Sequence, residues 1–167
     1  KGEEVKILDC MGLDREHIEQ DGDYFRHGLG LDAIYKYIKD YNPDVIGIAS
    51  MFTLHYHGVK DVAKVAREAC PKALIVVGGS NASALPQMVI DDTNVDIVVI
   101  GEGELTLLEI VEKQEKGEDL LNVLGTVVRE DGKMKRNPPR EFIQDLDSLP
   151  FPARDMIPIE AYYNDKY

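Results

Sequence analysis

The sequence predicts an α/β fold in which helices cover both faces of an open, doubly wound parallel sheet. Runs rich in β-branched residues at 45–49, 74–77 and 95–100 are typical of buried strands. Each run is followed by a segment in which apolar residues recur at helical spacing. Strands and helices that alternate over short connections indicate parallel strands joined by crossover helices.

The helices expected between these strands have recognisable ends. They are predicted at residues 31–41, 59–69, 85–90 and 104–116. Ile34 and Ile38 lie on one face of the first helix, and Pro43 follows its end. Pro71 ends the second helix, and Gly117 is the expected C-terminal cap of the last one.

The first residues predict an incomplete sheet. Residues 5–9 read as a short strand, and residues 11–30 as a polar loop with one helical turn near 15–19. Lys1-Gly-Glu-Glu4 resembles the end of a helix, so we expect the first strand of the sheet to be missing from this chain. Such a sheet is expected to be less stable, or to be completed by its neighbours or by dimerisation.

The C-terminal part departs from the alternating pattern. Residues 126–129 and 133–136 flank Glu130-Asp-Gly132, which predicts an antiparallel hairpin. Prolines at 150, 152 and 158 predict a stiff, extended linker. We therefore divide the chain into an α/β domain (1–122), a hairpin extension (123–140) and a linker (141–167), and expect it to belong to a larger protein.

Composition excludes several classes of function. With 19 basic and 31 acidic residues the net charge is −12, which disfavours nucleic acids and anionic membranes as partners. No apolar run reaches the roughly 18 residues that cross a bilayer, and Lys1 does not open a signal peptide. Cys10 and Cys70 match no metal spacing and are expected to be reduced thiols of a cytoplasmic protein.

Polar residues and glycines follow the predicted strands, where parallel sheets bind ligands. The candidate binding residues are Ser50, Thr53, Gly78, Gly79, Ser80, Gly101, Glu102 and Gly103. Glycines let a backbone approach a ligand closely, although Gly78-Gly79 is explained equally well by a tight turn. The edge is polar and nearly uncharged, which suits a large neutral ligand with amide groups.

Other kinds of site are not supported. No phosphate-binding glycine loop of the Gly-x-x-x-x-Gly-Lys or Gly-x-Gly-x-x-Gly type is present. His55 and His57 have no partner at ligand spacing, so we expect them to face solvent or a ligand rather than a metal ion. No Ser-His-Asp or Cys-His arrangement is evident, and no catalytic residue is predicted.

Four motifs follow one another along the chain. They are Asn42-Pro-Asp-Val-Ile-Gly-Ile-Ala-Ser-Met51, Val76-Val-Gly-Gly-Ser-Asn-Ala-Ser83, Val95-Asp-Ile-Val-Val-Ile-Gly-Glu-Gly-Glu104 and Leu146-Asp-Ser-Leu-Pro-Phe-Pro-Ala-Arg154. In this order they resemble the N-terminal region of the B12-binding radical SAM proteins. Each motif alone is weak, but four at matching spacing are specific. The resemblance covers residues 4–155.

The resemblance implies a flavodoxin-like or Rossmann-like fold whose strand-end loops hold cobalamin. Carried over, Ser50 and Thr53 lie along the nucleotide tail, and Gly78, Gly79 and Ser80 line the same slot. Gly101, Glu102 and Gly103 form its far wall. Related enzymes use Asp-x-His-x-x-Gly, whose His binds cobalt, and this chain has no such motif. Either the motif precedes Lys1, or the lower face of cobalt has no protein ligand.

The resemblance also implies a catalytic half outside this chain. In the family the linker leads to a radical SAM barrel that holds S-adenosylmethionine and a 4Fe–4S cluster on a three-cysteine loop. The intact protein is then expected to methylate a small-molecule substrate with methylcobalamin. The alternatives are an anaerobic magnesium-protoporphyrin ester cyclase, and a degenerate interaction module without cofactor. A receiver domain needs an acidic pair and a strand-end Lys, which are not found here.

Overall fold

A computed structural model describes residues 2–92 and 94–163 of the chain. They form two compact units. Residues 35–144 make one unit, and the residues up to 34 together with those from 145 onward make the other. None of the helices in the described ranges is both long and apolar enough to cross a membrane.

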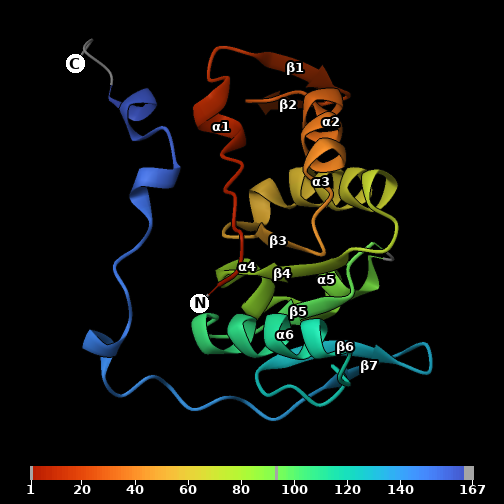
Figure 1. Ribbon diagram of the computed structural model, residues 1–167. Coiled ribbons are helices and arrows are strands. Elements are labelled where there is room, and N and C mark those ends of the chain that lie inside the picture. The colour runs from red at the N-terminus through yellow and green to blue at the C-terminus, as the bar shows by residue number, and fades with distance from the viewer. Residues whose placement is uncertain (1, 93, 164–167) are drawn as a thin grey trace. The chain divides into compact units, whose positions relative to one another are not determined.

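A five-stranded sheet forms the centre of the 35–144 unit (Figure 1). Its strands, in spatial order, are β3 (Val45–Ala49), β4 (Leu74–Gly78), β5 (Ile97–Val99), β6 (Thr126–Glu130) and β7 (Lys133–Arg136). The first three strands are parallel, as predicted, and the last two are antiparallel to their neighbours. The hairpin thus continues the sheet beyond β5.

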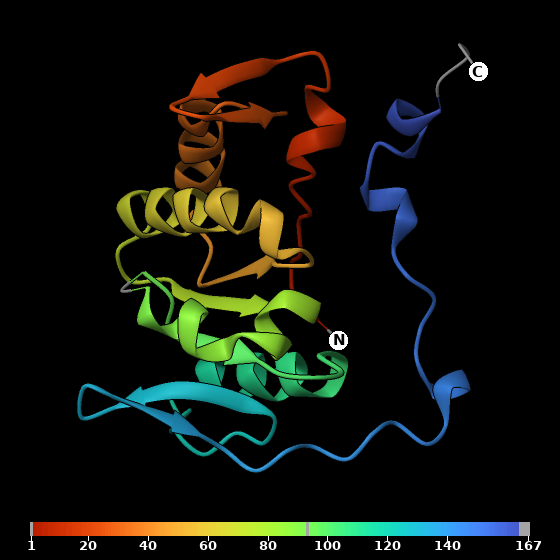
Figure 2. The same ribbon diagram turned by 180° about the vertical axis from the view of Figure 1, so that it is seen from behind.

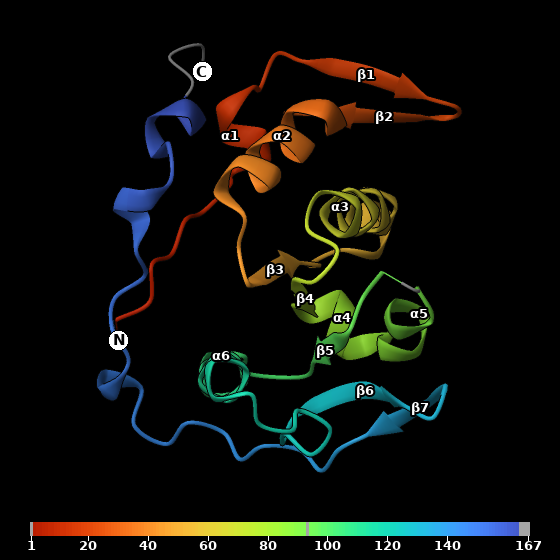
Figure 3. The same cartoon turned by 45° about the vertical axis from the view of Figure 1, so that its right-hand side comes forward.

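Helices cover both faces of this sheet, as predicted. In Figure 3, α3 (Tyr56–Ala69), α4 (Ser80–Ala84) and α5 (Pro86–Asp91) lie on one side of the sheet and α6 (Glu104–Lys116) on the other. Figure 2 shows the side that carries α3, α4 and α5. Alternate side chains separate two cores, because Val77 packs with Val59 of α3 whereas Val76 packs with Ile110 of α6.

Turn and cap residues act as the sequence predicted in this unit. Asp131 and Gly132, between β6 and β7, both have positive φ, as a tight hairpin turn requires. Gly117 caps α6 in the left-handed conformation. Helix α2 (Leu31–Tyr41) also has its predicted bounds. The helix α4 was not predicted, because its sequence of small polar residues carries no apolar stripe.

Two predictions for the first residues are wrong. Residues 5–9 form no strand, because a strand needs a neighbour for its backbone hydrogen bonds and the described chain offers none there. Asp9 instead caps α1 (Cys10–Leu13) and accepts a hydrogen bond from the Gly12 amide at 3.0 Å. The expected loop contains a hairpin of β1 (Ile18–Asp21) and β2 (Tyr24–His27), with no helical turn at 15–19.

The last described residues follow an extended course broken by short 3₁₀ turns, η2 (Leu146–Ser148), η3 (Arg154–Met156) and η4 (Ile159–Tyr162). The Tyr162 hydroxyl donates a hydrogen bond that is shared by the two carboxylate oxygens of Asp9, at 2.7 and 2.8 Å. Arg15 donates to the Ala161 carbonyl and lies over the Tyr162 ring. Helix α1 and η4 are therefore joined within their unit.

Candidate functional site

The three predicted loops meet at the carboxyl edge of β3, β4 and β5. The Ser50 amide donates to the Gly78 carbonyl at 2.7 Å, and the Asn81 amide donates to the Ser50 carbonyl at 3.1 Å. The Gly101 amide donates to the Ser83 hydroxyl at 3.0 Å. The ends of the three strands thus form one connected edge, as the parallel arrangement predicted.

Asn81 holds the loop after β3 in shape. Its Nδ2 donates to the Ser50 Oγ at 2.9 Å, and its Oδ1 accepts from the Thr53 Oγ1 at 2.7 Å. Ser50 and Asn81 are only 1% and 4% exposed, and Thr53 begins the turn η1 (Thr53–His55). Asn81 was not among the predicted site residues. The sequence does place its amide group at the same polar edge as the Ser80 and Ser83 hydroxyls, directly after Gly78-Gly79, but does not reveal its contacts with Ser50 and Thr53.

Gly79 allows the loops after β3 and β4 to touch each other. Its φ is +113°, and a Cβ at this position would lie 2.6 Å from the Ser50 carbonyl oxygen. Next to it, the Ser80 hydroxyl donates to the Met51 carbonyl at 2.6 Å. The space between these two strand ends is therefore filled by the protein's own backbone, and here the tight turn explains the glycine.

A strip of small residues lies on the face of the sheet that carries α6. Gly47 and Ala49 share this face with Val45, which packs against the α6 core, and Gly78 is paired with Ala49. Gly47 and Ala49 are exposed, and a Cβ at Gly47 would meet no atom within 4 Å. We call Gly47, Ala49 and Gly78 the small-residue strip. Gly47 was missed, although a glycine inside a β-branched strand is itself a signal.

The loop between β5 and α6 borders this strip. A Cβ at Gly78 would lie 3.7 Å from Val99, and one at Gly103 would lie 3.6 Å from the same side chain. Gly101 has a φ of +76° and open space around it. The Glu102 carboxylate accepts a hydrogen bond from the Ile143 amide at 2.8 Å, a structural role that the sequence did not reveal.

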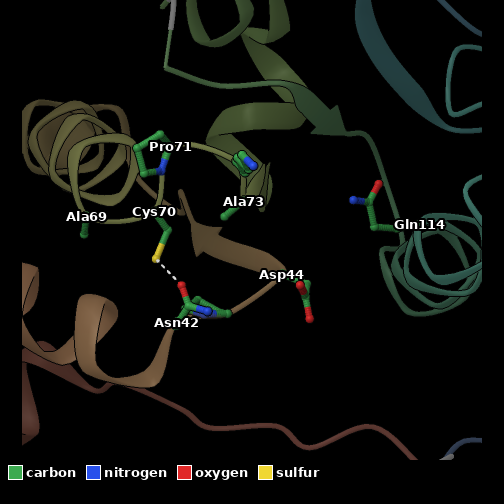
Figure 4. Close-up of a pocket in the computed structure, with 9 residues that line it drawn as sticks. Asn42, Asp44, Ala69, Cys70, Pro71, Ala73 and Gln114 are labelled. Atoms are coloured by element: carbon green, nitrogen blue, oxygen red, sulfur yellow. Dashed lines mark hydrogen bonds between the residues drawn. The ribbon is translucent and has the colours of Figure 1, made fainter.

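Two of the cavities in this unit bear on the position of the site. One of about 230 Å³ adjoins the β5–α6 loop and is lined by Gly101, Glu102, Arg140 and Phe142, among others. The larger one, of about 360 Å³, lies at the amino ends of β3 and β4, away from the strand-end loops (Figure 4). There the Cys70 thiol contacts the Asn42 amide oxygen at 3.8 Å.

The sheet, with helices on both faces and glycine-bearing loops at the carboxyl ends of its parallel strands, has the architecture of the α/β domains that bind ligands at that edge. Residues 1–111 match the family model described as the B12 binding domain. The chain belongs to this family, which confirms the resemblance seen in the four motifs.

Curated relatives span more than this chain. It is 34% identical over 163 residues to an uncharacterized methyltransferase of Pyrococcus horikoshii, covering 97% of this chain and 32% of the relative. It is 32% identical over 189 residues to cytidylyl-2-hydroxyethylphosphonate methyltransferase of Streptomyces wedmorensis, covering 99% and 35%. An anaerobic magnesium-protoporphyrin IX monomethyl ester cyclase of Rubrivivax gelatinosus is 26% identical over 132 residues, with 76% and 24% covered. The chain thus spans about a third of its first two relatives.

A solved structure shares the fold. The radical S-adenosylmethionine methyltransferase TsrM of Kitasatospora setae, with cobalamin and a 4Fe–4S cluster bound, superposes with a TM-score of 0.60 at 18% identity. The match covers 70% of this chain and 22% of that one. The predicted Rossmann-like architecture is therefore confirmed.

Proposed function

We propose that this chain binds cobalamin at the carboxyl edge of its sheet, beside the small-residue strip. The observation that carries the proposal is Gly47, an exposed glycine at which an added Cβ would meet no atom within 4 Å, next to Gly78 and Ala49. Larger side chains there would occupy the face beside α6. Since the chain belongs to the B12-binding family, cobalamin is the ligand that we expect on this open face.

The predicted binding residues divide into two groups in this proposal. Gly78, a member of the strip, and Gly101 and Gly103, in the loop that borders it, would lie against the ligand. The other group shapes the loops, since Ser50, Thr53, Gly79, Ser80 and Glu102 are engaged with Asn81, backbone atoms or the linker. Bound methylcobalamin supplies a transferable methyl group, while these residues hold the loops and exclude water.

We further propose that the intact protein is a radical SAM methyltransferase. The names of two curated relatives support methyl transfer, and the fold is shared with a radical SAM enzyme. The 4Fe–4S cluster, S-adenosylmethionine and the small-molecule substrate would belong to a domain reached through the linker at 141–167. A domain of residues 1–122 with a hairpin extension at 123–140 remains the proposed division.

A cyclase is the second candidate, supported by the 26% identical relative. With the intact protein, transfer of a labelled methyl group from S-adenosylmethionine to bound cobalamin and on to a product would support the methyltransferase. Ring closure without net methyl transfer would support the cyclase.

We also propose that the chain can dimerise through the unpaired edge of β3. Among the described strands, β3 is paired with β4 alone. An open strand edge can pair with a second copy. Sedimentation velocity would detect the dimer.

Titration with hydroxocobalamin tests the binding proposal. We expect a change in the visible spectrum and co-elution of the corrin on gel filtration. Gly47→Leu should abolish both, because the added side chain occupies the strip. Gly58→Leu is the matched control, since Gly58 lies on α3, over the opposite face, with no atom within 4 Å of a Cβ.

Both variants must first be shown to have the same melting temperature as the wild-type chain. Binding that survives Gly47→Leu would overturn the location of the site. A wild-type chain that binds no corrin would instead support the degenerate interaction module.

A further inference from the structure

We infer that Glu102 and Arg140 form a clamp that ties the start of the linker to the β5–α6 loop, so that occupancy of the cofactor site changes how firmly the linker is held. The inference rests on the proposed function for its link to the ligand. The clamp itself rests on contacts within residues 35–144.

Glu102 supplies the first point of the clamp. Its Oε2 accepts a hydrogen bond from the Ile143 amide at 2.8 Å. Ile143 lies in no helix or strand, so its amide has no partner from regular structure. A carboxylate acceptor makes this hydrogen bond stronger than one between neutral groups.

Arg140 supplies the second point. Its Nε donates to the Thr106 Oγ1 at 2.9 Å, and its guanidinium pairs with the Glu109 carboxylate. Thr106 is fully buried, and Thr106 and Glu109 are three residues apart on the same side of α6. One side chain thus fixes the segment to the first turns of the helix.

Polar contacts rather than apolar burial hold the segment between these points. Phe142 is 70% exposed, and Ile143 is half-buried without belonging to the buried core. Upstream, the Gly125 amide donates to the Pro138 carbonyl at 2.8 Å, and the Asn137 amide group donates to the Leu121 carbonyl at 2.9 Å. Loss of the clamp contacts would therefore release residues 141–143 without exposing any new core.

The β5–α6 loop has room to move. Gly101 has a left-handed backbone with open space around it, and the cavity of about 230 Å³ is lined by this loop as well as by Arg140 and Phe142. A ligand that presses on Gly101 or Gly103 would displace Glu102, which lies between them. Because Glu102 holds the Ile143 amide, that displacement reaches the linker.

Amide hydrogen exchange of this chain, followed by NMR, tests the clamp without any cofactor. In Glu102→Ala the Ile143 amide should exchange about tenfold faster, as expected for the loss of one hydrogen bond. Glu102→Gln, which keeps an acceptor oxygen, should lie between this variant and the wild type. Arg140→Ala should speed exchange at residues 141–143, whereas Arg154→Ala, further along the linker, should not. Equal Ile143 exchange in Glu102→Ala and the wild type would overturn the clamp.

A second step tests the link to the ligand. Saturation with hydroxocobalamin should change the Ile143 exchange rate in the wild type and leave it unchanged in Glu102→Ala. If the wild type binds the corrin without this change, the coupling is wrong and the proposed function stands. If it binds no corrin, the proposed function and the coupling both fail, while the first step still decides the clamp.

Discussion

Asn81 donates a hydrogen bond from its Nδ2 to the Ser50 Oγ at 2.9 Å, and both side chains are almost completely buried. The same amide accepts from Thr53. One side chain thus fixes the loop that follows β3. Asn81→Ala should lower the free energy of unfolding by about 2 kcal/mol, since it leaves a buried hydroxyl without its partner.

Urea denaturation measures this loss, and two variants control it. Asn81→Asp keeps the acceptor for Thr53 but not the donor for Ser50, so it should retain only part of the stability. Ser80→Ala removes a hydroxyl that donates to the Met51 carbonyl from an exposed position, and should cost less. An Asn81→Ala variant as stable as the wild type would contradict the role of Asn81.

Gly79→Ala and Gly101→Ala should differ in cost, although both glycines have positive φ. At Gly79 a Cβ would lie 2.6 Å from the Ser50 carbonyl oxygen, and the backbone (φ 113°, ψ 177°) lies in a region restricted to glycine. We expect a loss of about 3 kcal/mol there. At Gly101 an added Cβ would meet no atom within 4 Å. Only the left-handed backbone conformation then destabilises the alanine variant, by about 1 kcal/mol of unfolding free energy. Equal losses in thermal or urea unfolding would show that the contact at Gly79 is not tight.

Arg67 joins the end of α3 to the amino ends of β4 and β5. Its guanidinium donates to the Ala73 carbonyl at 2.8 Å and to the Asp96 carboxylate at 2.6 Å. Asp96 in turn accepts from the Ile75 amide at 2.7 Å. Arg67→Ala should therefore cost about 2 kcal/mol of unfolding free energy, because hydrogen bonds to charged groups are lost together.

Lys113→Ala is the control for this variant. Its ion pair with Glu118, at 3.4 Å, is more exposed and should contribute less than about 1 kcal/mol. High salt should weaken this pair more than the Arg67 contacts. A loss at Arg67 no larger than at Lys113 would contradict the assigned role.

Tyr56 should make the fold sensitive to alkaline pH. Burial, together with the charges of Asp92 and Asp91, raises the pKa of its hydroxyl, which donates to the Met88 carbonyl at 3.1 Å. A raised pKa in the folded state means that this contribution to stability is complete below about pH 10 and is lost as the pH rises through the folded-state value. Tyr56→Phe should remove that part of the alkaline decline.

The measurement is the urea midpoint from about pH 9 to about pH 12, with tyrosinate absorbance followed in parallel. Tyr162, whose pKa is also raised, by burial and by Asp9, stays in both proteins and does not affect the comparison. Parallel declines in the wild type and Tyr56→Phe would rule out this role for Tyr56.

Elements with strong periodic patterns could be predicted from the sequence. Val45–Ala49 and Glu104–Lys116 have their predicted bounds, although β3 is only half-buried or exposed along its length and α6 buries just Thr106 and Ile110 completely. The strand Ile18–Asp21 gave no such signal, since all four residues are exposed. The segment 5–9 shows the converse, because a β-rich sequence forms no strand without a neighbour to pair with.

The sequence by itself determined the family, the alternation of strands and helices, and the position of the glycine loops at the strand ends. Only the tertiary structure decided what each glycine faces. Gly79 lies against the Ser50 carbonyl, whereas Gly47 opens onto free space beside α6. Such differences arise from strand register and from the packing of α6, which join residues far apart in the chain. A local pattern therefore cannot distinguish a glycine that lets two loops touch from one that leaves room for a ligand.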